Sequence, residues 1–355
     1  MRCSAETEAP LQLRAGITFN LKKNTASDLP GRSAGPDCCK RSGPPDAEAE
    51  FDDEETIRAI QSALEAAGLS VELYEAAEEL PVRLLQNRPD IVFNIAEGVA
   101  GRGREAQVPA ILNFLNIPFT GSDETALCVA MDKALTKRLA ASWGVSTPDY
   151  EVVKYGAAFL QTGLSFPVIV KPNNEGSSKG VSSLSITGDA AVLRRIVQEK
   201  MNDYKQDMLL EEYIGGREFT AGILGNGEEL RVFPPMEIIF LDKSKNIYSC
   251  EVKKDFRRYV RYECPPDIGA GLKKEIEETA KTVYRSLDCR DFALVDFRLS
   301  PEGRLYFIEI NPLAGLAPGY SDFPMIAEFN GMDYQTLIRN ILHCALARYG
   351  LNKRG

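Results

Sequence analysis

The sequence predicts an α/β protein of three units, of which the first is doubly wound and the third adds α+β character. The chain has 355 residues, enough for two or three units that each bury a core. Hydrophobic residues make up 44% and charged residues 26% of it, as in globular proteins. Strand patterns alternate with helical patterns in the first third of the chain, which is typical of parallel strands joined by crossover helices.

The first unit is expected to span residues 1–121. Its first strand is predicted at 13–21, and a segment rich in proline, glycine and charge, from Lys22 to about Ala49, is predicted to be a loop. The other predicted elements are a helix that ends at Gly68, strands at 71–74 and 88–95, and a helix at 109–117.

The second unit is expected at 122–210 and the third at 211–355. In the second, one helix is predicted at 124–143, followed by strands at 166–172, 181–186 and 207–214 and a helix at 190–201. In the third, strands are predicted at 218–224, 234–240, 292–300 and 304–310, and helices at 271–287 and 332–349.

Composition limits the possible functions. The net charge of −9 argues against a nucleic-acid partner. Since no apolar run reaches the roughly 20 residues of a membrane helix, and the first residues lack a signal-peptide pattern, we expect a cytoplasmic protein without a membrane partner. The eight scattered cysteines are expected to be reduced thiols. The single histidine, His343, argues against a Ser–His–Asp triad or a multi-histidine metal centre.

A polar glycine loop, NNEGSSKG at 173–180, follows a predicted strand that carries Lys171 near its end. Glycines free the backbone, so several N–H groups of such a loop can point at a phosphate. Most glycine-rich loops between strands are plain hairpins, and the chain contains no Walker motif. The position directly after Lys171 favours a phosphate site.

The segment LLEEYIGGREF at 209–219 carries two candidate nucleotide ligands, Glu211 and Glu218. One glutamate, with adjacent backbone groups, can bind an adenine amino group, and the other can accept hydrogen bonds from ribose. On its own, the segment favours a solvated acidic loop.

The most specific pattern is ALVDFRLSPEGRLYFIEINP at 293–312, which predicts a hairpin with a turn at 301–304. With Ser300 paired to Leu305, Asp296 lies opposite Glu309 and Leu294 opposite Asn311. Asp296, Glu309, Asn311 and Arg298 then share one face, while Val295, Phe297, Ile308 and Ile310 share the other. Converging oxygen ligands are what Mg²⁺ prefers, so we expect a magnesium site there.

A basic segment, CEVKKDFRRYVRY at 250–262, is predicted to be a loop with a cluster of cationic side chains. A solvated basic loop is the common outcome for such a pattern. In an acidic chain, however, a local cationic cluster favours binding of anionic substrate or phosphate groups, and this interpretation points to Lys254 and Arg257.

Together these segments resemble the ATP-grasp superfamily and, within it, the D-alanine–D-alanine ligases, from about Asp90 to Tyr349. The resemblance implies an ATP-grasp fold with ATP held between the second and third units. It implies ATP contacts by Lys133, Lys171, Glu175, Gly176, Ser177, Ser178, Gly180, Glu211, Ile214, Glu218 and Lys253. It also implies two Mg²⁺ ions, replaceable by Mn²⁺, at Asp296, Glu309 and Asn311. Catalytic roles are expected for Arg298, Lys253 and Ser177, and substrate contacts for Ser321, Lys254 and Arg257.

The sequence departs from the family pattern where the amino-acid substrates bind. The first strand continues as GITFNLKKN, without the family's glutamate for the first D-alanine, and AEGVAGRGREAQ at 96–107 lacks the family's histidine. Lys254 stands where the family has tyrosine, and Leu294 where it has arginine. We therefore expect an altered pair of substrates.

These observations predict an ATP-dependent carboxylate–amine ligase that joins two small amino-acid-like molecules through an acyl phosphate and acts as a homodimer. Three alternatives stay open: an authentic D-alanine–D-alanine ligase of cell-wall synthesis, a small-molecule kinase that stops before the amine step, and a non-catalytic nucleotide-binding protein.

Overall fold

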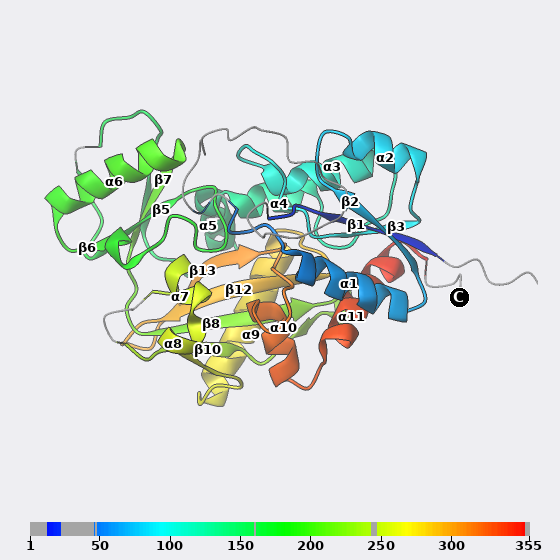
Figure 1. Ribbon diagram of the computed structural model, residues 1–355. Coiled ribbons are helices and arrows are strands. Elements are labelled where there is room, and N and C mark those ends of the chain that lie inside the picture. Colours follow the sequence, from blue (N-terminus) through cyan, green and yellow to red (C-terminus); the bar gives the residue numbers. More distant parts are fainter. Residues whose placement is uncertain (1–12, 23–45, 47, 160, 243–246, 352–355) are drawn as a thin grey trace, which may run out of the picture.

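The computed structural model describes residues 13–22, 46, 48–159, 161–242 and 247–351. It contains three sheets, with helices packed against each (Figure 1). Most of the loop predicted between Lys22 and Ala49 lies outside the described residues. Within the described part of the chain, no helix is both long and apolar enough to cross a bilayer.

The first sheet is parallel, with strand order β2-β1-β3, and agrees with the predicted doubly wound unit. Its strands are β1 Arg14–Phe19, β2 Ser70–Glu75 and β3 Ile91–Asn94. Its helices are α1 Glu54–Ala66, α2 Leu80–Gln86 and α3 Gln107–Phe114. Helix α1 begins at Asp53, whose carboxylate accepts a hydrogen bond from the Thr56 N–H at 2.9 Å, as an N-cap does.

The second sheet is antiparallel, with order β4-β7-β5-β6. Its strands are β4 Tyr150–Val153, β5 Val168–Pro172, β6 Ile186–Thr187 and β7 Met208–Glu212, and helix α6 Ala190–Tyr204 packs on it. The single helix predicted at 124–143 was wrong, because the chain forms α4 Glu124–Met131 and α5 Lys133–Ser142. The backbone of Asp132 is extended and separates the two helices. Its carboxylate accepts a hydrogen bond from the Leu135 N–H at 3.0 Å, as the N-cap of α5.

The third sheet has the order β11-β10-β8-β12-β13, and β9 pairs with β8. Its strands are β8 Arg217–Leu224, β9 Arg231–Val232, β10 Met236–Phe240, β11 Val260–Glu263, β12 Phe292–Leu299 and β13 Leu305–Asn311. The associated helices are α9 Ala270–Ser286, α10 Asp322–Phe329 and α11 Tyr334–Arg348.

The basic segment at 250–262 is not the predicted loop. It forms the short helices α7 Cys250–Lys254 and α8 Phe256–Tyr259, and then strand β11. Val252 and Val260 are buried beside Ile238 of β10, so the segment contributes apolar side chains to a small core of its own. The density of basic residues in the sequence obscured these two apolar positions.

The β12–β13 hairpin has the predicted pairing at its acidic end and a different pairing at its turn. Asp296 lies opposite Glu309 and Leu294 opposite Asn311, as predicted, but Leu299 instead of Ser300 pairs with Leu305. Between the Asp296 and Phe297 pairs, a bulge gives β13 one extra residue, Ile308, and this brings Asp296 opposite Glu309 as predicted. As a consequence Ile308, predicted on the apolar face, lines the same cavity as Glu309.

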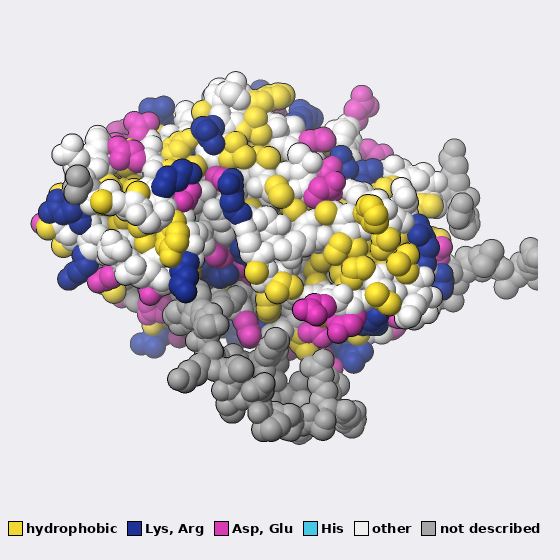
Figure 2. All heavy atoms as spheres, turned by 90° about the horizontal axis from the view of Figure 1, so that it is seen from above, with side chains coloured by type: hydrophobic (Ala, Val, Ile, Leu, Met, Phe, Trp, Pro, Cys, Tyr) yellow, Lys and Arg dark blue, Asp and Glu magenta, His cyan; other side chains and the backbone are white. Residues whose placement is uncertain are grey.

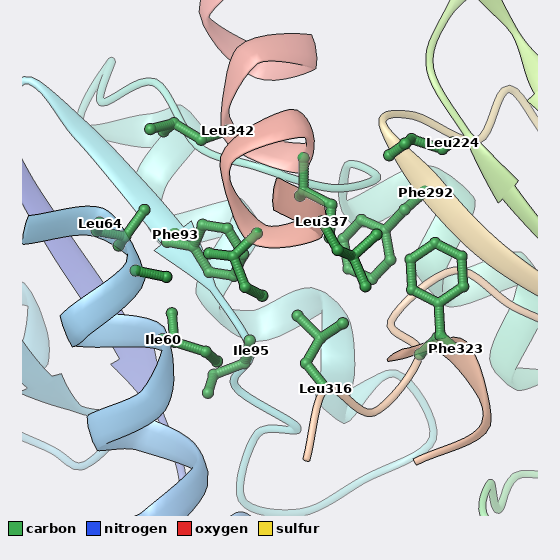
Figure 3. Close-up of a cluster of buried hydrophobic side chains, with 14 of the residues drawn as sticks. Ile60, Leu64, Phe93, Ile95, Leu224, Phe292, Leu316, Phe323, Leu337 and Leu342 are labelled. Atoms are coloured by element: carbon green, nitrogen blue, oxygen red, sulfur yellow. The ribbon is translucent and has the colours of Figure 1, made fainter. Parts of the chain in front are cut away.

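Two large cores connect the units. One lies under the third sheet and helix α9 and includes Val295, Phe297 and Ile310. The other joins the first sheet and α1 to α10 and α11, and Figure 3 shows Phe323 beside Phe292, with Phe93 in the same cluster. The first and last parts of the chain therefore share one hydrophobic core.

A buried carboxylate, Asp291, links the same two parts of the chain. Its Oδ2 accepts hydrogen bonds from the Gly121 N–H and from Arg348 Nη2, both at 2.8 Å, and its Oδ1 accepts one from Asn226 Nδ2 at 2.7 Å. These partners come from the end of the first unit, from helix α11 and from the loop after β8. Asp291 is fully buried, so loss of its carboxylate would leave Arg348 without its charge partner.

We therefore predict that Asp291→Ala lowers the free energy of unfolding by about 3–5 kcal/mol, the usual cost of removing one partner of a buried ion pair. Glu328→Ala, at an exposed position of α10, is the matched control and should change it by less than about 0.5 kcal/mol. Urea unfolding of both variants checks this. Equal effects of the two substitutions would show that the Asp291 junction contributes little.

Candidate active site

A cavity lies between the second and third sheets, and we call it the inter-sheet cavity. Its walls come from β5 and β7 on one side, from β12 and β13 on the other, and from α5 and α7. Of the residues predicted to contact ATP, eight line it: Lys133, Lys171, Glu175, Ser178, Glu211, Ile214, Glu218 and Lys253. Asp296, Glu309 and Arg298 line it as well. Residues far apart in sequence thus converge as predicted.

Four lysines line the cavity, and one of them, Lys179, belongs to ion pairs of the glycine loop. Of the other three, two are paired with carboxylates. Lys133 Nζ lies 2.5 Å from a Glu309 oxygen, and Lys171 Nζ lies 2.9 Å from a Glu211 oxygen. Burial lowers the pKa of Lys133, but Glu309 outweighs this effect and the net shift is upward. The third, Lys253, places its ammonium 4.7 Å from the centre of the Tyr248 ring. Burial lowers and the carboxylates of Asp322 and Asp296 raise the pKa of Lys253, again with a net upward shift.

Asp296 and Glu309 face each other across the hairpin, and Asn311 lies two residues after Glu309 on β13. Burial and the neighbouring Glu309 raise the pKa of Asp296, whereas Lys133 and Lys171 outweigh burial at Glu309 and lower its pKa. Asn311 lines two neighbouring cavities, and its Oδ1 accepts a hydrogen bond from the Leu313 N–H at 3.0 Å. The three side chains offer the oxygen donors that a hard divalent cation prefers.

Arg298 lies on the same strand as Asp296 and is nearly buried. Its guanidinium is 3.1 Å from a Glu218 oxygen and 4.9 Å from the centre of the Tyr213 ring. A residue expected to contact ATP, Glu218, and a residue expected to be catalytic, Arg298, are therefore partners in this structure.

The glycine loop at 173–180 is held by carboxylates. The Gly176 N–H donates to Glu50 Oε1 and the Gly180 N–H donates to Asp46 Oδ2, each at 2.8 Å. Ser178 Oγ donates to the Tyr248 carbonyl at 2.8 Å and connects the loop to the segment before α7. The amides of Gly176 and Gly180, which are expected to contact phosphate, thus donate to carboxylates in this structure.

A second, larger cavity of about 420 Å³, which we call the outer cavity, adjoins the acidic end of the hairpin. Ser321, Lys254 and Ser177 line it, as do Asn311 and Asp322. The predicted substrate residue Arg257 does not, because its guanidinium lies over the exposed side of Phe256, 5.6 Å from the ring centre.

A third cavity, the acid cavity, was missed by the sequence interpretation. Glu50, Glu97, Glu105, Glu175 and Ser177 line it together with Glu309 and Asn311. The carboxylate oxygens of Glu50, Glu97 and Glu105 lie within 4.8 Å of one another. Glu97 and Glu105 belong to the segment 96–107, for which the sequence indicated only a departure from the family pattern.

Two cations and two of these carboxylates form a closed ring of ion pairs. Arg104 contacts Glu50 at 2.6 Å and Glu175 at 3.3 Å, and Lys179 contacts Glu50 at 3.1 Å and Glu175 at 2.6 Å. The ring is neutral, so it does not compensate Glu97 and Glu105. Burial, reinforced by neighbouring acids, raises the pKa of both carboxyls, that of Glu105 to about 8.

We predict that Lys171→Ala raises the Kd of a non-hydrolysable ATP analogue by roughly 10- to 100-fold, since a hydrogen bond to a charged group contributes about 1.5–3 kcal/mol. Lys154→Ala is the control, because Lys154 is exposed and its pair with Asp207 contributes little. Calorimetric titration measures both constants. Unchanged affinity of the Lys171 variant would remove this lysine from the nucleotide site.

Comparison with known proteins places the chain in a family. The family model described as "D-ala D-ala ligase C-terminus" matches residues 139–343, more than half of the chain. The D-alanine–D-alanine ligase of Aquifex aeolicus (strain VF5) is 35% identical over 297 residues, which cover 81% of this chain and 93% of that protein. The uncharacterised protein y4sG of Sinorhizobium fredii is 34% identical over 270 residues, 76% of this chain and 79% of that protein.

The fold agrees with this placement. The crystal structure of D-alanine–D-alanine ligase from Bacillus anthracis complexed with ATP superposes with a TM-score of 0.71 at 21% identity, covering 95% of this chain and 99% of that one. The predicted fold class is thereby confirmed. The chain belongs to the D-alanine–D-alanine ligase family, a family of ATP-dependent ligases with the ATP-grasp fold that form carbon–nitrogen bonds.

Proposed function

We propose that this ligase joins the carboxylate of one amino-acid-like substrate to the amine of another through an acyl phosphate formed from ATP. The observation that carries the proposal is the inter-sheet cavity, where lysines from three separate elements lie beside two half-buried acids of one hairpin. Such a set positions a triphosphate and compensates the charge that develops during phosphoryl transfer.

ATP is proposed to bind with its base near β7 and its phosphates near Lys133, Lys171 and Lys253. The inter-sheet cavity holds only about 70 Å³ in this conformation, well below the roughly 300–1,000 Å³ of a typical ligand pocket. The nucleotide therefore enters when the 173–180 loop and α7 move apart, and the hydrogen bond between Ser178 and Tyr248 closes the site again.

The acid set is proposed to hold magnesium. Asp296, Glu309 and Asn311 supply oxygen donors at paired positions of the hairpin, and the like-charged Asp296 and Glu309 gain from a cation between them. Mg²⁺, or Mn²⁺ in its place, would neutralise charge on the phosphate oxygens when bound. Lys133, which now pairs with Glu309, would then be free to contact phosphate.

In the first chemical step, a carboxylate oxygen of the donor substrate attacks the γ-phosphorus. A bond forms between this oxygen and the γ-phosphorus, and the bond between the γ-phosphorus and the bridging oxygen of ADP breaks. Lys253 and Lys171 stabilise the negative charge of the phosphoryl group during the transfer. In the second step, the amine of the other substrate attacks the acyl carbon and phosphate leaves. Arg298 and backbone N–H groups are the proposed donors to the tetrahedral oxyanion. Ser177 lines both the acid and the outer cavity, where the two substrates would meet.

The donor substrate is proposed to be an amino acid whose ammonium faces the acid cavity. Glu97 and Glu105 are 9% and 6% exposed, and no cation among the described residues pairs with either. An ammonium bound there would lie next to Asn311 and Glu309, close to the phosphoryl-transfer site. Glu50, which the 46–51 segment brings to this cavity, provides the N-terminal glutamate that the first strand lacks.

The acceptor substrate is proposed to bind in the outer cavity, with its carboxylate near Ser321 and Lys254. Lys254 replaces the tyrosine that the family pattern has at this position, and it favours an additional anionic group on the acceptor. A second candidate function is D-alanine–D-alanine ligation itself, which the names of several relatives at 30–35% identity favour.

We also propose a homodimer in the cytoplasm. Figure 2, viewed over α2 and α3, shows hydrophobic side chains gathered on this face, and Val82, Leu85 and Phe114 are exposed on these helices. Contact with a second copy would cover this apolar surface.

Asp296→Asn and Glu309→Gln are predicted to reduce turnover by at least 10³-fold while the protein stays folded, because each removes a charge that phosphoryl transfer requires. ADP and phosphate release, measured with and without an amine substrate, gives the rate and also tests for a kinase that needs no amine. Glu302→Gln, in the exposed turn of the same hairpin, is the control. Near-normal activity of either acid variant would refute the metal assignment.

Acceptor specificity is predicted to favour acidic or larger amino acids over D-alanine. We expect kcat/KM for an acidic acceptor to exceed that for D-alanine by at least tenfold, and Lys254→Tyr to reduce this ratio by roughly tenfold, since a charge-assisted pair is lost. Arg257→Ala, outside the outer cavity, should leave the ratio unchanged. If D-alanine proves the best substrate at both sites, the second candidate function is correct.

A further inference from the structure

Lys137 is a buried cation that does not line the inter-sheet cavity, although its neighbours do. It lies one helical turn after Lys133 on α5, and its side chain is 1% exposed. Its ammonium donates to Thr147 Oγ1 at 3.0 Å, to Glu211 Oε1 at 3.1 Å and to the Ile308 carbonyl at 3.0 Å. All three N–H donors of the ammonium are therefore used.

The partners of Lys137 come from both sheets that enclose the cavity. Glu211 belongs to β7 of the second sheet, and Ile308 belongs to β13 of the third, directly before Glu309. A single ammonium thus fixes the carboxylate of Glu211 and the backbone next to an acid of the hairpin. A structural role of this kind follows from the contacts alone.

The charges around Glu211 indicate a second role. Glu211 is almost fully buried between two lysines, with Oε1 on Lys137 and Oε2 on Lys171, the latter at 2.9 Å. Burial raises the pKa of this carboxyl, the two ammonium groups lower it, and the net shift is downward, so Glu211 is ionised. The three side chains together carry one net positive charge.

Only one of these two lysines reaches the cavity. Lys171 lines it, whereas Lys137 is enclosed by protein. If Glu211 had Lys171 as its only partner, the pair would be neutral and would attract an anion weakly. Burial lowers the pKa of Lys137 to about 8, against the opposing effect of Glu211. Because the protonated Lys137 compensates Glu211 on the side away from the cavity, the positive charge of Lys171 remains available on the cavity side.

We propose that Lys137 is a positioning residue that compensates the charge of Glu211 and thereby leaves Lys171 available for the phosphates of the nucleotide. The inference rests on the proposed binding of ATP in the inter-sheet cavity. Lys137 would then strengthen the binding of the phosphates and not that of the base, although it does not line the cavity.

The test compares ATP with adenosine, which lacks the phosphates, by calorimetric titration of a non-hydrolysable ATP analogue and of adenosine. For Lys137→Met we expect the Kd of the ATP analogue to rise at least tenfold and the Kd of adenosine to change less than twofold. Lys137→Arg keeps the charge and should keep the wild-type ratio of the two constants within threefold. A structural role alone would weaken both ligands equally.

A second set of variants tests whether restoring the charge balance around Glu211 restores phosphate binding. Lys137→Met combined with Glu211→Gln leaves Lys171 as the only charge of the three, so the preference for the ATP analogue over adenosine should return to within threefold of wild type. Glu211→Gln alone should increase that preference. These two variants also decide the question if Lys137→Met does not fold, since neither buries an unpaired carboxylate.

Two results would overturn the inference: an equal loss of both ligands in Lys137→Met, or a double variant that fails to regain the preference for phosphate. Failure of the wild-type protein to bind the ATP analogue would instead refute the proposed nucleotide site, so the two failures are distinguishable. None of these titrations requires knowledge of the amino-acid substrates.

Discussion

Charge balance in the space between the second and third sheets is the constraint on which the rest of the structure depends. A buried carboxylate stays ionised only when cations lie beside it. Glu309 is paired with Lys133 of α5, and Glu211 with Lys137 of the same helix and Lys171 of β5. Because helix α5 supplies partners to both sheets, its position fixes the width of the cavity, and the position of α5 is in turn fixed by the break at Asp132.

The elements that the sequence predicted well are those with strong local patterns. The strand before the glycine loop is apolar on both faces, and the hairpin at 292–311 alternates strictly near its acids, so Lys171, Asp296 and Glu309 could be placed from period two alone. The predicted pairing of Asp296 with Glu309 is nevertheless confirmed, because two deviations from the predicted hairpin cancel each other. The turn begins one residue earlier than predicted, and a bulge near Ile308 offsets it. A bulge leaves no local signal in the side chains.

The remainder of the site depends on contacts between distant segments, which no single sequence reveals. Asp46 and Glu50 meet the glycine loop across about 130 positions of the chain, and Glu97 and Glu105 become a pair only through the fold. The secondary structure of 250–262 was also predicted wrongly. Its many cationic residues indicated a loop, whereas the segment begins with two short helices and buries Val252. The first strand lacks the family's glutamate, as the sequence indicated, and Glu50 of a later segment lines the acid cavity.

The central claim is that ATP activates a carboxylate as an acyl phosphate in this site. The most direct measurement labels the carboxylate of the donor amino acid with ¹⁸O and analyses the phosphate released during turnover by mass spectrometry, with the substrate pair that gives the highest rate of ADP release. The account predicts one ¹⁸O atom in each phosphate released, because the oxygen that attacks the γ-phosphorus leaves with it when the amine displaces phosphate. Phosphate without the label, or label found in AMP, would contradict the account.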